Sequence, residues 1–252
     1  MPNSLDRGPA IPTFTGRLFY VFDPRPEDVH ISDIAHAHSM DCRWTGHTRF
    51  HFSVGQHCVI ASFSGPIEGA IDRLMHDSPE AYLRDLSRRI KADPRFSAYL
   101  QLEEQIADVV GRRFNLAADF WRNGPTNEVD FAMARTERRQ LINRLPTEPM
   151  EASSLEIAST IQMWTPIETE IAFLTRFGEL TGTNVEQHLR LALAEFEKTG
   201  AVFGAHPARL QVELALLIAE SVRSESSNAR AAAERARVAY WAMLGIDVKD
   251  GR

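Results

Sequence analysis

Apolar residues recur at intervals of three and four through most of this 252-residue chain. That spacing places them on one face of a helix. The clearest case is residues 96–114, with Leu100, Ile106, Val109 and Val110 on one side. Further helices are expected at residues 28–40, 54–63, 67–77, 127–145, 166–181, 184–199 and 208–244. Strand-like alternation is limited to a short run at residues 17–22, so the pattern predicts an all-α fold.

Proline marks the candidate boundaries of the chain. Residues 1–30 carry five prolines and are expected to be largely irregular. Residues 145–149, Leu-Pro-Thr-Glu-Pro, separate an N-terminal domain (1–145) from a C-terminal helical extension (146–252). A chain of this length can bury a full core without disulfides.

Composition narrows the functional class. The net charge of -6 argues against a surface that binds a nucleic acid polymer, because such a surface needs an excess of Lys and Arg. Cys42 and Cys58 are expected to be free thiols in a reducing cytoplasm. Residues 1–10 lack the apolar core of a signal peptide, and the longest strongly apolar run, residues 214–219, is too short to span a bilayer. The sequence therefore predicts a soluble cytoplasmic protein without a membrane partner.

A His76-Asp77 pair ends the apolar helical run of residues 67–75, with His57 upstream and Asp130 downstream. Imidazole and carboxylate groups suit Zn, Mn, Fe or Co better than Mg or Ca. Adjacent helical residues point about 100° apart, so His76 and Asp77 cannot enclose an ion alone. Other helices would have to supply His57 and Asp130. The competing interpretation is a chance dipeptide, since helical aspartates are usually solvated or cap a helix.

Several segments in order carry a resemblance to a known family. Residues 52–57, 74–91 and 129–138 follow the H…HD…D order, which resembles the HD-domain phosphohydrolase superfamily. Together with residues 33–39 and 42–47 they are similar to the 5'-deoxynucleotidases and the phage dATP triphosphohydrolase group within it. The resemblance covers residues 15–145 and implies an HD-domain helical bundle.

The resemblance implies roles for particular residues. The implied metal ligands are His57, His76, Asp77 and Asp130. Glu80 matches the carboxylate that orients or deprotonates the attacking water, although a surface glutamate is the alternative. Asp85 and Lys91 match an element near the phosphate and sugar. Lys91 would present a positive charge to the phosphate; a solvated lysine is the alternative.

Arg43 and Trp44 match an arginine–aromatic pair that holds the phosphate and the nucleotide. Arginine offers bidentate phosphate contacts and tryptophan can stack on a base, but a buried structural tryptophan is an equal alternative. His47 and Arg49 are weaker phosphate candidates. We expect His36 and His38 to be structural or partly exposed.

The chain also departs from the family pattern. Residues 86–91 lack the family's prolines and carry Arg88 and Arg89. These arginines either favour a more highly phosphorylated substrate or face solvent. His38 replaces a usual leucine, and residues 146–252 match nothing in the family pattern.

These features predict a metal-dependent hydrolase of (deoxy)nucleotide 5'-phosphates. It would act as a deoxynucleoside monophosphate 5'-nucleotidase or a deoxynucleoside triphosphate triphosphohydrolase, including one of dATP type. A Mg²⁺ ion on the substrate phosphates would be a second cofactor. The alternatives are hydrolysis of a cyclic nucleotide or a guanosine polyphosphate alarmone, and a non-catalytic nucleotide sensor. The resemblance also implies a homo-oligomer, because such assemblies are common in the resembled families. Leucines of the C-terminal helices could pack between copies or on the core of their own chain; these are Leu191, Leu193, Leu210, Leu214 and Leu217.

Overall fold

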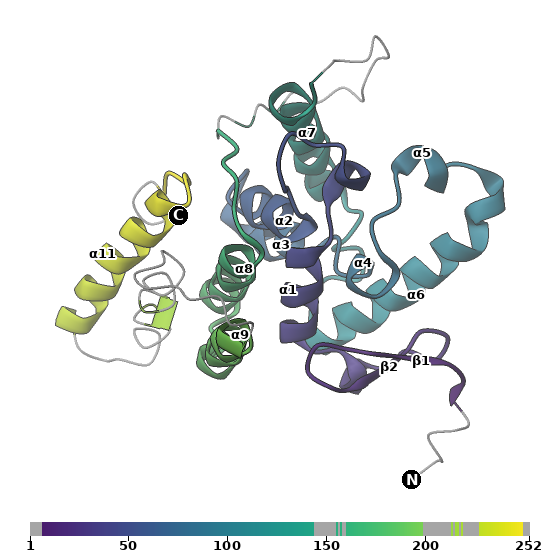
Figure 1. Cartoon of the computed structure of the whole chain (residues 1–252), viewed down its shortest axis with the longest axis horizontal. Helices are drawn as coiled ribbons and strands as arrows, with labels where there is room; N and C mark the ends of the chain where they lie inside the picture. The colour runs from purple at the N-terminus through teal and green to yellow at the C-terminus, as the bar shows by residue number, and fades with distance from the viewer. Residues whose placement is uncertain are drawn as a thin grey trace.

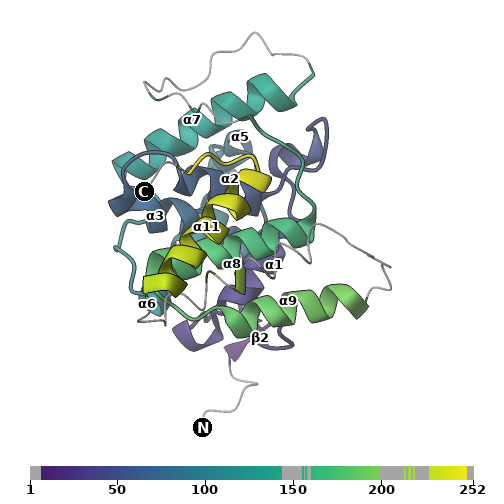
Figure 2. The same ribbon diagram turned by 90° about the vertical axis from the view of Figure 1, so that its left-hand side faces the viewer.

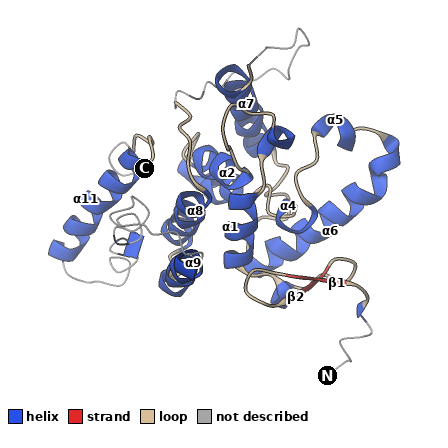
Figure 3. Ribbon diagram, in the orientation of Figure 1, coloured by secondary structure: helices blue, strands red, loops and turns tan. Residues whose placement is uncertain are grey.

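The computed structural model describes residues 7–143, 155, 157, 160–198, 213, 215, 216, 218 and 227–248. These residues are mostly helical, and the one sheet among them has two strands. The all-α prediction is therefore confirmed (Figure 3).

The chain begins with the antiparallel pair β1 (Ala10–Pro12) and β2 (Leu18–Tyr20), the second lying where a strand-like run was expected. Four 3-10 turns lie between the later elements: η2 (Pro26–Asp28), η3 (Arg43–Gly46), η4 (Ile67–Gly69) and η5 (Pro94–Phe96). The helices are α1 (Ile31–Met40), α2 (Val54–Ser62), α3 (Ala70–Met75), α4 (Glu80–Leu83), α5 (Arg88–Lys91), α6 (Ser97–Phe114), α7 (Gly124–Leu141), α8 (Pro166–Thr181), α9 (Glu186–Lys198) and α11 (Ser227–Met243).

Capping side chains explain where the central helices begin. At the start of α2 the Ser53 side chain accepts a hydrogen bond from the Gln56 backbone N–H. At α8, Thr165 and Glu168 form a reciprocal capping box, and Pro166 occupies the first turn. Gly182 ends α8 in a left-handed conformation, with φ 70. The predicted bounds of α8 are therefore confirmed.

Helix α2 is the centre of the fold. All nine of its residues are buried, and it packs against α1, α3, α7 and α8 (Figure 1). Helix α8 also packs against α1 and α3. Because α2, α3 and α7 meet here, side chains on three helices can face a common point.

The C-terminal helices share this core. Arg176 of α8 is buried and bonds to Ser62 at the end of α2. Trp241 of α11 packs edge-on to Phe63 and donates to Glu179 of α8. Figure 2 shows α11 lying across α8 on the face opposite α6.

Several C-terminal predictions cannot be compared with the structure. The boundary at residues 145–149 lies outside the described residues, so the division into two domains stays a prediction. Leu210, Leu214 and Leu217 also lie outside them, and Leu191 and Leu193 are partly buried on α9. Association between copies therefore stays a prediction. Among the described helices, none is both long and apolar enough to cross a bilayer.

Candidate metal centre

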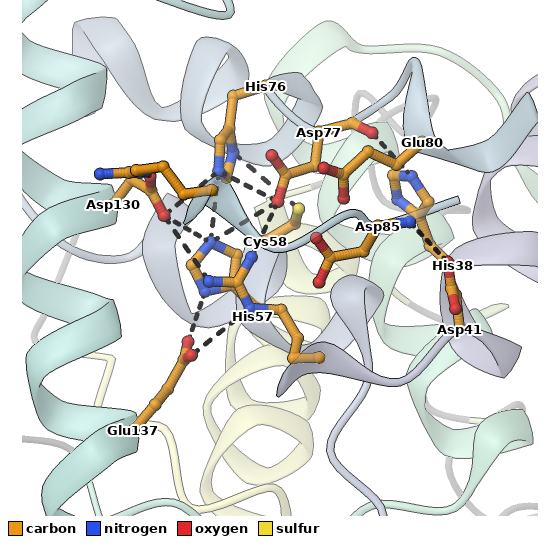
Figure 4. A network of polar contacts seen from close by, with 12 residues as sticks. His38, Asp41, His57, Cys58, His76, Asp77, Glu80, Asp85, Asp130 and Glu137 are labelled. Carbon is orange, nitrogen blue, oxygen red and sulfur yellow. Dashed lines mark hydrogen bonds and ion pairs between the residues drawn. The ribbon is translucent and has the colours of Figure 1, made fainter. Parts of the chain in front are cut away.

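Four side chains from three parts of the fold converge on one point (Figure 4). His57 comes from the middle of α2, His76 and Asp77 directly follow α3, and Asp130 lies in α7. His57 Nε2 lies 3.2 Å from His76 Nε2 and 3.3 Å from Asp130 Oδ1. Asp77 Oδ2 lies 3.3 Å from His76 Nε2 and 3.8 Å from His57 Nε2. The structure thus brings together all four residues that the sequence singled out.

The three shorter separations fit a common ion, whereas the 3.8 Å between His57 Nε2 and Asp77 Oδ2 and the 3.9 Å between His76 Nε2 and Asp130 Oδ1 are slightly longer. Metal–ligand bonds of about 2.0–2.2 Å place neighbouring ligand atoms roughly 3–3.6 Å apart. The two imidazoles are buried, and the carboxylates are only slightly exposed, with side-chain exposures of 16% for Asp77 and 15% for Asp130. The expectation that separate helices must complete the ligand set agrees with this geometry. His57, His76 and Asp130 form one group that could hold a metal ion, and Asp77 lies next to it, beside His76.

The hydrogen bonds of the two imidazoles supply a second argument. His57 Nδ1 lies 2.5 Å from Glu137 Oε1, and His76 Nδ1 lies 2.8 Å from the Arg73 carbonyl oxygen. Both partners accept, so each Nδ1 carries the proton. Two neutral rings would then face each other through Nε2 lone pairs only 3.2 Å apart. That arrangement needs a cation between them, either a proton or a metal ion.

Glu137 is a further candidate residue that was not among the predicted site residues. Its side chain is fully buried, and it accepts from both His57 and the Trp44 indole N–H, the latter at 2.8 Å. A carboxylate on the far nitrogen of a ligating histidine fixes its ring orientation and raises its basicity. Glu137 lies seven residues after Asp130 on α7, two helical turns along the same face. That spacing was visible in the sequence.

Arg43 lies among the carboxylates of the cluster. Its guanidinium lies 3.2 Å from Asp77 Oδ2, 3.8 Å from Asp130 Oδ1 and 3.4 Å from Glu137 Oε2. Trp44, the neighbouring candidate, is half-buried with its indole tied to Glu137. Arg43 and Trp44, the two residues predicted to hold the nucleotide, therefore lie against the candidate metal ligands or against Glu137.

Proton affinities in the cluster reflect an excess of carboxylates. Burial and Arg43 oppose protonation of His57, but Glu137 and Asp130 outweigh them and raise its pKa to about 9. Burial would raise the pKa of Asp130, yet the hydrogen bond to His57 and the positive groups around it hold that pKa far below its usual range. The pKa of Asp77 is likewise lowered, against burial, by His76 and Arg43. The cluster thus attracts positive charge, as a divalent-metal site does.

Glu80 lies beside the ligands, one turn after Asp77. It is 6% exposed, and its pKa is raised well above the usual range by burial and by Asp77 and Asp85. The Asp85 carboxyl is near enough to Arg43, Asp77 and Lys91 for their charges to influence it, and burial raises its pKa. Glu80 and Asp85 therefore both lie near the predicted centre (Figure 4).

The Lys91 ammonium is paired with two carboxylates, so it is not free to bind a phosphate. It lies 2.9 Å from Glu80 Oε1 and 2.5 Å from Glu103 Oε1. Glu103, on α6, was not among the predicted site residues. Of the two arginines that depart from the family pattern, Arg88 reaches Asp130 Oδ2 at 2.7 Å, and its guanidinium lies 4.5 Å from the Phe131 ring.

Two further residues support the ligands. His38 is fully buried and donates from Nε2 to the Asp77 carbonyl oxygen at 3.1 Å. Burial lowers the pKa of His38 to about 4, so its ring is neutral at physiological pH. Cys58, next to His57, lies close enough to His76 and Asp77 to form a second group that could hold a metal. His38 is therefore structural, as expected, while supporting a ligand.

The chain is similar to two curated bacterial proteins. It is 37% identical over 131 residues to the uncharacterized protein YfdR of Escherichia coli, a match covering 52% of this chain and 71% of that protein. It is 33% identical over 113 residues to the uncharacterized protein RCAP_rcc00048 of Rhodobacter capsulatus, covering 41% of this chain and 57% of that protein. No protein-family model matches the chain. At this identity and coverage, the chain belongs to the same protein family as YfdR.

Proposed function

We propose that this protein is a metal-dependent phosphohydrolase that acts on the 5'-phosphate groups of deoxynucleotides. The observation that carries the proposal is the meeting of two Nε2 lone pairs and two carboxylate oxygens at one point, with a separate buried carboxylate beside them. Such a set serves hydrolysis, because one group of residues holds an ion and another handles the proton of water.

The proposed ligands are His57, His76, Asp77 and Asp130, and a transition metal such as Zn, Mn, Co or Fe suits their mixture of nitrogen and oxygen. When bound, such an ion activates water and polarises a phosphoryl oxygen. Carboxylates outnumber permanent cations around this point, which favours an ion of charge +2. The carboxylates are Asp77, Glu80, Asp85, Glu103, Asp130 and Glu137, and the cations are Arg43, Arg88 and Lys91.

In this proposal Glu80 takes the proton of the attacking water. Its Oε1 bonds to Lys91, whereas its Oε2 is buried without a hydrogen-bond partner. A buried carboxylate oxygen without a donor is suited to accept a proton from water. Arg43 provides hydrogen bonds to the phosphoryl oxygens as negative charge develops. The choice of deoxynucleotides rests on the family resemblance alone.

A substrate panel tests the proposal. The purified protein is loaded separately with Mn, Co, Zn or Mg and incubated with deoxynucleoside mono- and triphosphates, ribonucleotides, cyclic nucleotides and guanosine polyphosphates. We expect release of phosphate or triphosphate from a deoxynucleotide, with products identified by chromatography. Release from no nucleotide with any metal contradicts the proposal, and turnover confined to cyclic nucleotides or guanosine polyphosphates reassigns the substrate.

Two variants identify the groups responsible. His76→Ala removes one ligand, and we expect it to lose both bound metal and activity. Glu80→Gln keeps the shape of the proton acceptor and all four ligands, so it should retain metal while losing about 10²- to 10⁴-fold in rate. Full activity in either variant shows that the assignment of that residue is wrong.

A further inference from the structure

The Lys91 ammonium lies between two buried carboxylates contributed by different helices. Glu80 belongs to α4 and Glu103 to α6, and each places one oxygen within hydrogen-bond distance of Lys91 Nζ, at 2.9 and 2.5 Å. The side-chain exposures are 18% for Lys91, 6% for Glu80 and 9% for Glu103. This triad is therefore a desolvated structural unit rather than a surface ion pair.

These contacts decide what Lys91 can do. An ammonium has three N–H donors, and two of them are directed at the carboxylates. Both carboxylates attract its positive charge, so a phosphate group would have to displace Glu80 or Glu103 to reach the ammonium. Arg43 and Arg88 are also paired with carboxylates, but these include the proposed metal ligands Asp77 and Asp130, so both guanidiniums lie where a phosphate on the ion would be.

The other charges near Glu80 explain why it needs such a partner. Asp77 and Asp85 repel its negative charge, whereas Lys91 attracts it. Lys91 fixes Oε1, which leaves the unpartnered Oε2 as the atom that can receive a proton. Glu103, on the long helix α6, also pairs with Lys91. The orientation of Glu80 is thus set by a chain of two residues.

We propose that Lys91 and Glu103 are positioning residues that hold the Glu80 carboxylate in its working orientation, and that Lys91 does not bind the substrate phosphate. This inference rests on the proposed function, because it assigns Glu80 the proton-accepting role. It differs from the role that the family resemblance implied for Lys91. It also assigns a role to Glu103.

A kinetic double-mutant cycle separates the two roles of Lys91. The proteins are the wild type, Glu80→Gln, Lys91→Met and the double variant, assayed on the substrate found in the panel. If Lys91 acts through Glu80, Lys91→Met lowers kcat about 10- to 100-fold and leaves KM within about twofold. In the Glu80→Gln background the same change has little further effect, roughly twofold or less, because coupled residues are non-additive. If Lys91 binds phosphate, KM rises and the two losses multiply, which overturns the inference.

Glu103 has a matched control on the same helix. Glu103→Gln keeps the side-chain shape and removes the charge, and we expect kcat to fall about 3- to 10-fold at unchanged KM, on the scale of one ordinary hydrogen bond. Glu104→Gln removes the adjacent, exposed carboxylate that pairs with Arg122, and it should leave kcat unchanged. Arg95→Met is the control for Lys91→Met. It removes the positive charge of a residue that is 84% exposed and bonds to Asp93, and it should also leave kcat unchanged. Equal effects of Glu103→Gln and Glu104→Gln contradict the positioning role.

Stability measurements separate failure of this inference from failure of the proposed function. Urea unfolding of the same four proteins reports whether Lys91 and Glu80 are energetically coupled, whether or not any substrate is turned over. Stability coupling with a wild type that hydrolyses no nucleotide means that the triad exists but the proposed function is wrong, and the positioning role falls with it. A second outcome is that Lys91 and Glu80 are coupled in stability and the wild type is active, but the kinetic losses of the two single variants multiply. That outcome overturns the positioning role alone. Coupling in both measurements supports it.

Discussion

His57 Nδ1 lies 2.5 Å from Glu137 Oε1, and both side chains are completely buried. Because the Nδ1 proton is directed at Glu137, the Nε2 lone pair points toward His76, Asp77 and Asp130. A carboxylate on α7 therefore sets the direction in which a ligand on α2 faces. This contact fixes the ring orientation of one candidate ligand of the metal centre.

We expect Glu137→Gln to weaken metal binding about 10- to 100-fold, because the loss of such an outer partner has that effect at other metal sites. The amide can preserve the hydrogen bond but not the charge. Competition with a chelator of known affinity, using Zn or Co, measures the change. Glu128→Gln, an exposed position on the same helix, is the control and should bind as the wild type does. Unchanged affinity in Glu137→Gln contradicts the role of Glu137.

The ligand set was predictable from the sequence because its members fall at recognisable places. His76 and Asp77 follow an apolar helical run, and His57 lies in a helix whose capping serine is evident. These local features singled the residues out but left a chance dipeptide as the alternative, and the ligand roles came from the family resemblance in the order H…HD…D. Local features also made the bounds of α8 predictable, from Thr165, Glu168 and Gly182.

The supporting residues were not predictable because their partners are distant in sequence. Glu137 meets His57 across a sequence separation of 80 residues. Glu103 meets Lys91 only because α5 folds back along α6. A lone glutamate on an amphipathic helix is usually solvated. The seven-residue spacing from Asp130 places Glu137 on the same helix face but does not by itself show that Glu137 is buried against His57. The pairing of Lys91 was not predictable for the same reason, since its two carboxylate partners come from other helices.

His38 provides a test of pH dependence. Its pKa falls from the ordinary 6.5 to about 4 because it is buried. Between these two values the unfolded chain binds the proton more readily than the folded one, so acid favours unfolding. The contribution of neutral His38 to the unfolding free energy is fully present above pH 6.5, and about 3 kcal/mol of it is lost as pH falls to 4.

Urea unfolding across this pH range measures the effect. His38→Leu removes the titrating group, so its unfolding free energy should fall less steeply with decreasing pH than that of the wild type. His47→Leu alters an exposed histidine and should leave the wild-type slope unchanged. Parallel curves for the wild type and His38→Leu contradict the assigned burial of a neutral imidazole.

Arg176 provides a test of how α8 is attached to α2. It is 2% exposed, donates to the Ser62 hydroxyl and carbonyl oxygens, and pairs with Glu179. Arg176→Met leaves the buried Ser62 oxygens and Glu179 Oε2 without this donor, while Glu179 Oε1 keeps Arg237 and Trp241. We therefore expect a loss of about 1–3 kcal/mol in unfolding free energy. Arg190→Met removes an exposed i,i+4 pair on α9 and should cost less than about 0.5 kcal/mol. Equal losses in chemical denaturation contradict this attachment.

Arg88 provides a test of how many phosphate groups the substrate carries. It lies at the edge of the centre, with 52% of its side chain exposed, and pairs with Asp130 while its guanidinium lies over Phe131. A cation that touches a ligand and also faces solvent can reach phosphates beyond the one being cleaved. We expect Arg88→Met to raise KM about tenfold for a deoxynucleoside triphosphate, on the scale of one lost charge-assisted contact, and much less for the monophosphate. Arg89→Met, one position along the same exposed turn, is the control, and metal content is measured in both variants. Equal KM changes for the two substrates mean that Arg88 does not distinguish phosphate number, and a loss of metal means that it acts through Asp130.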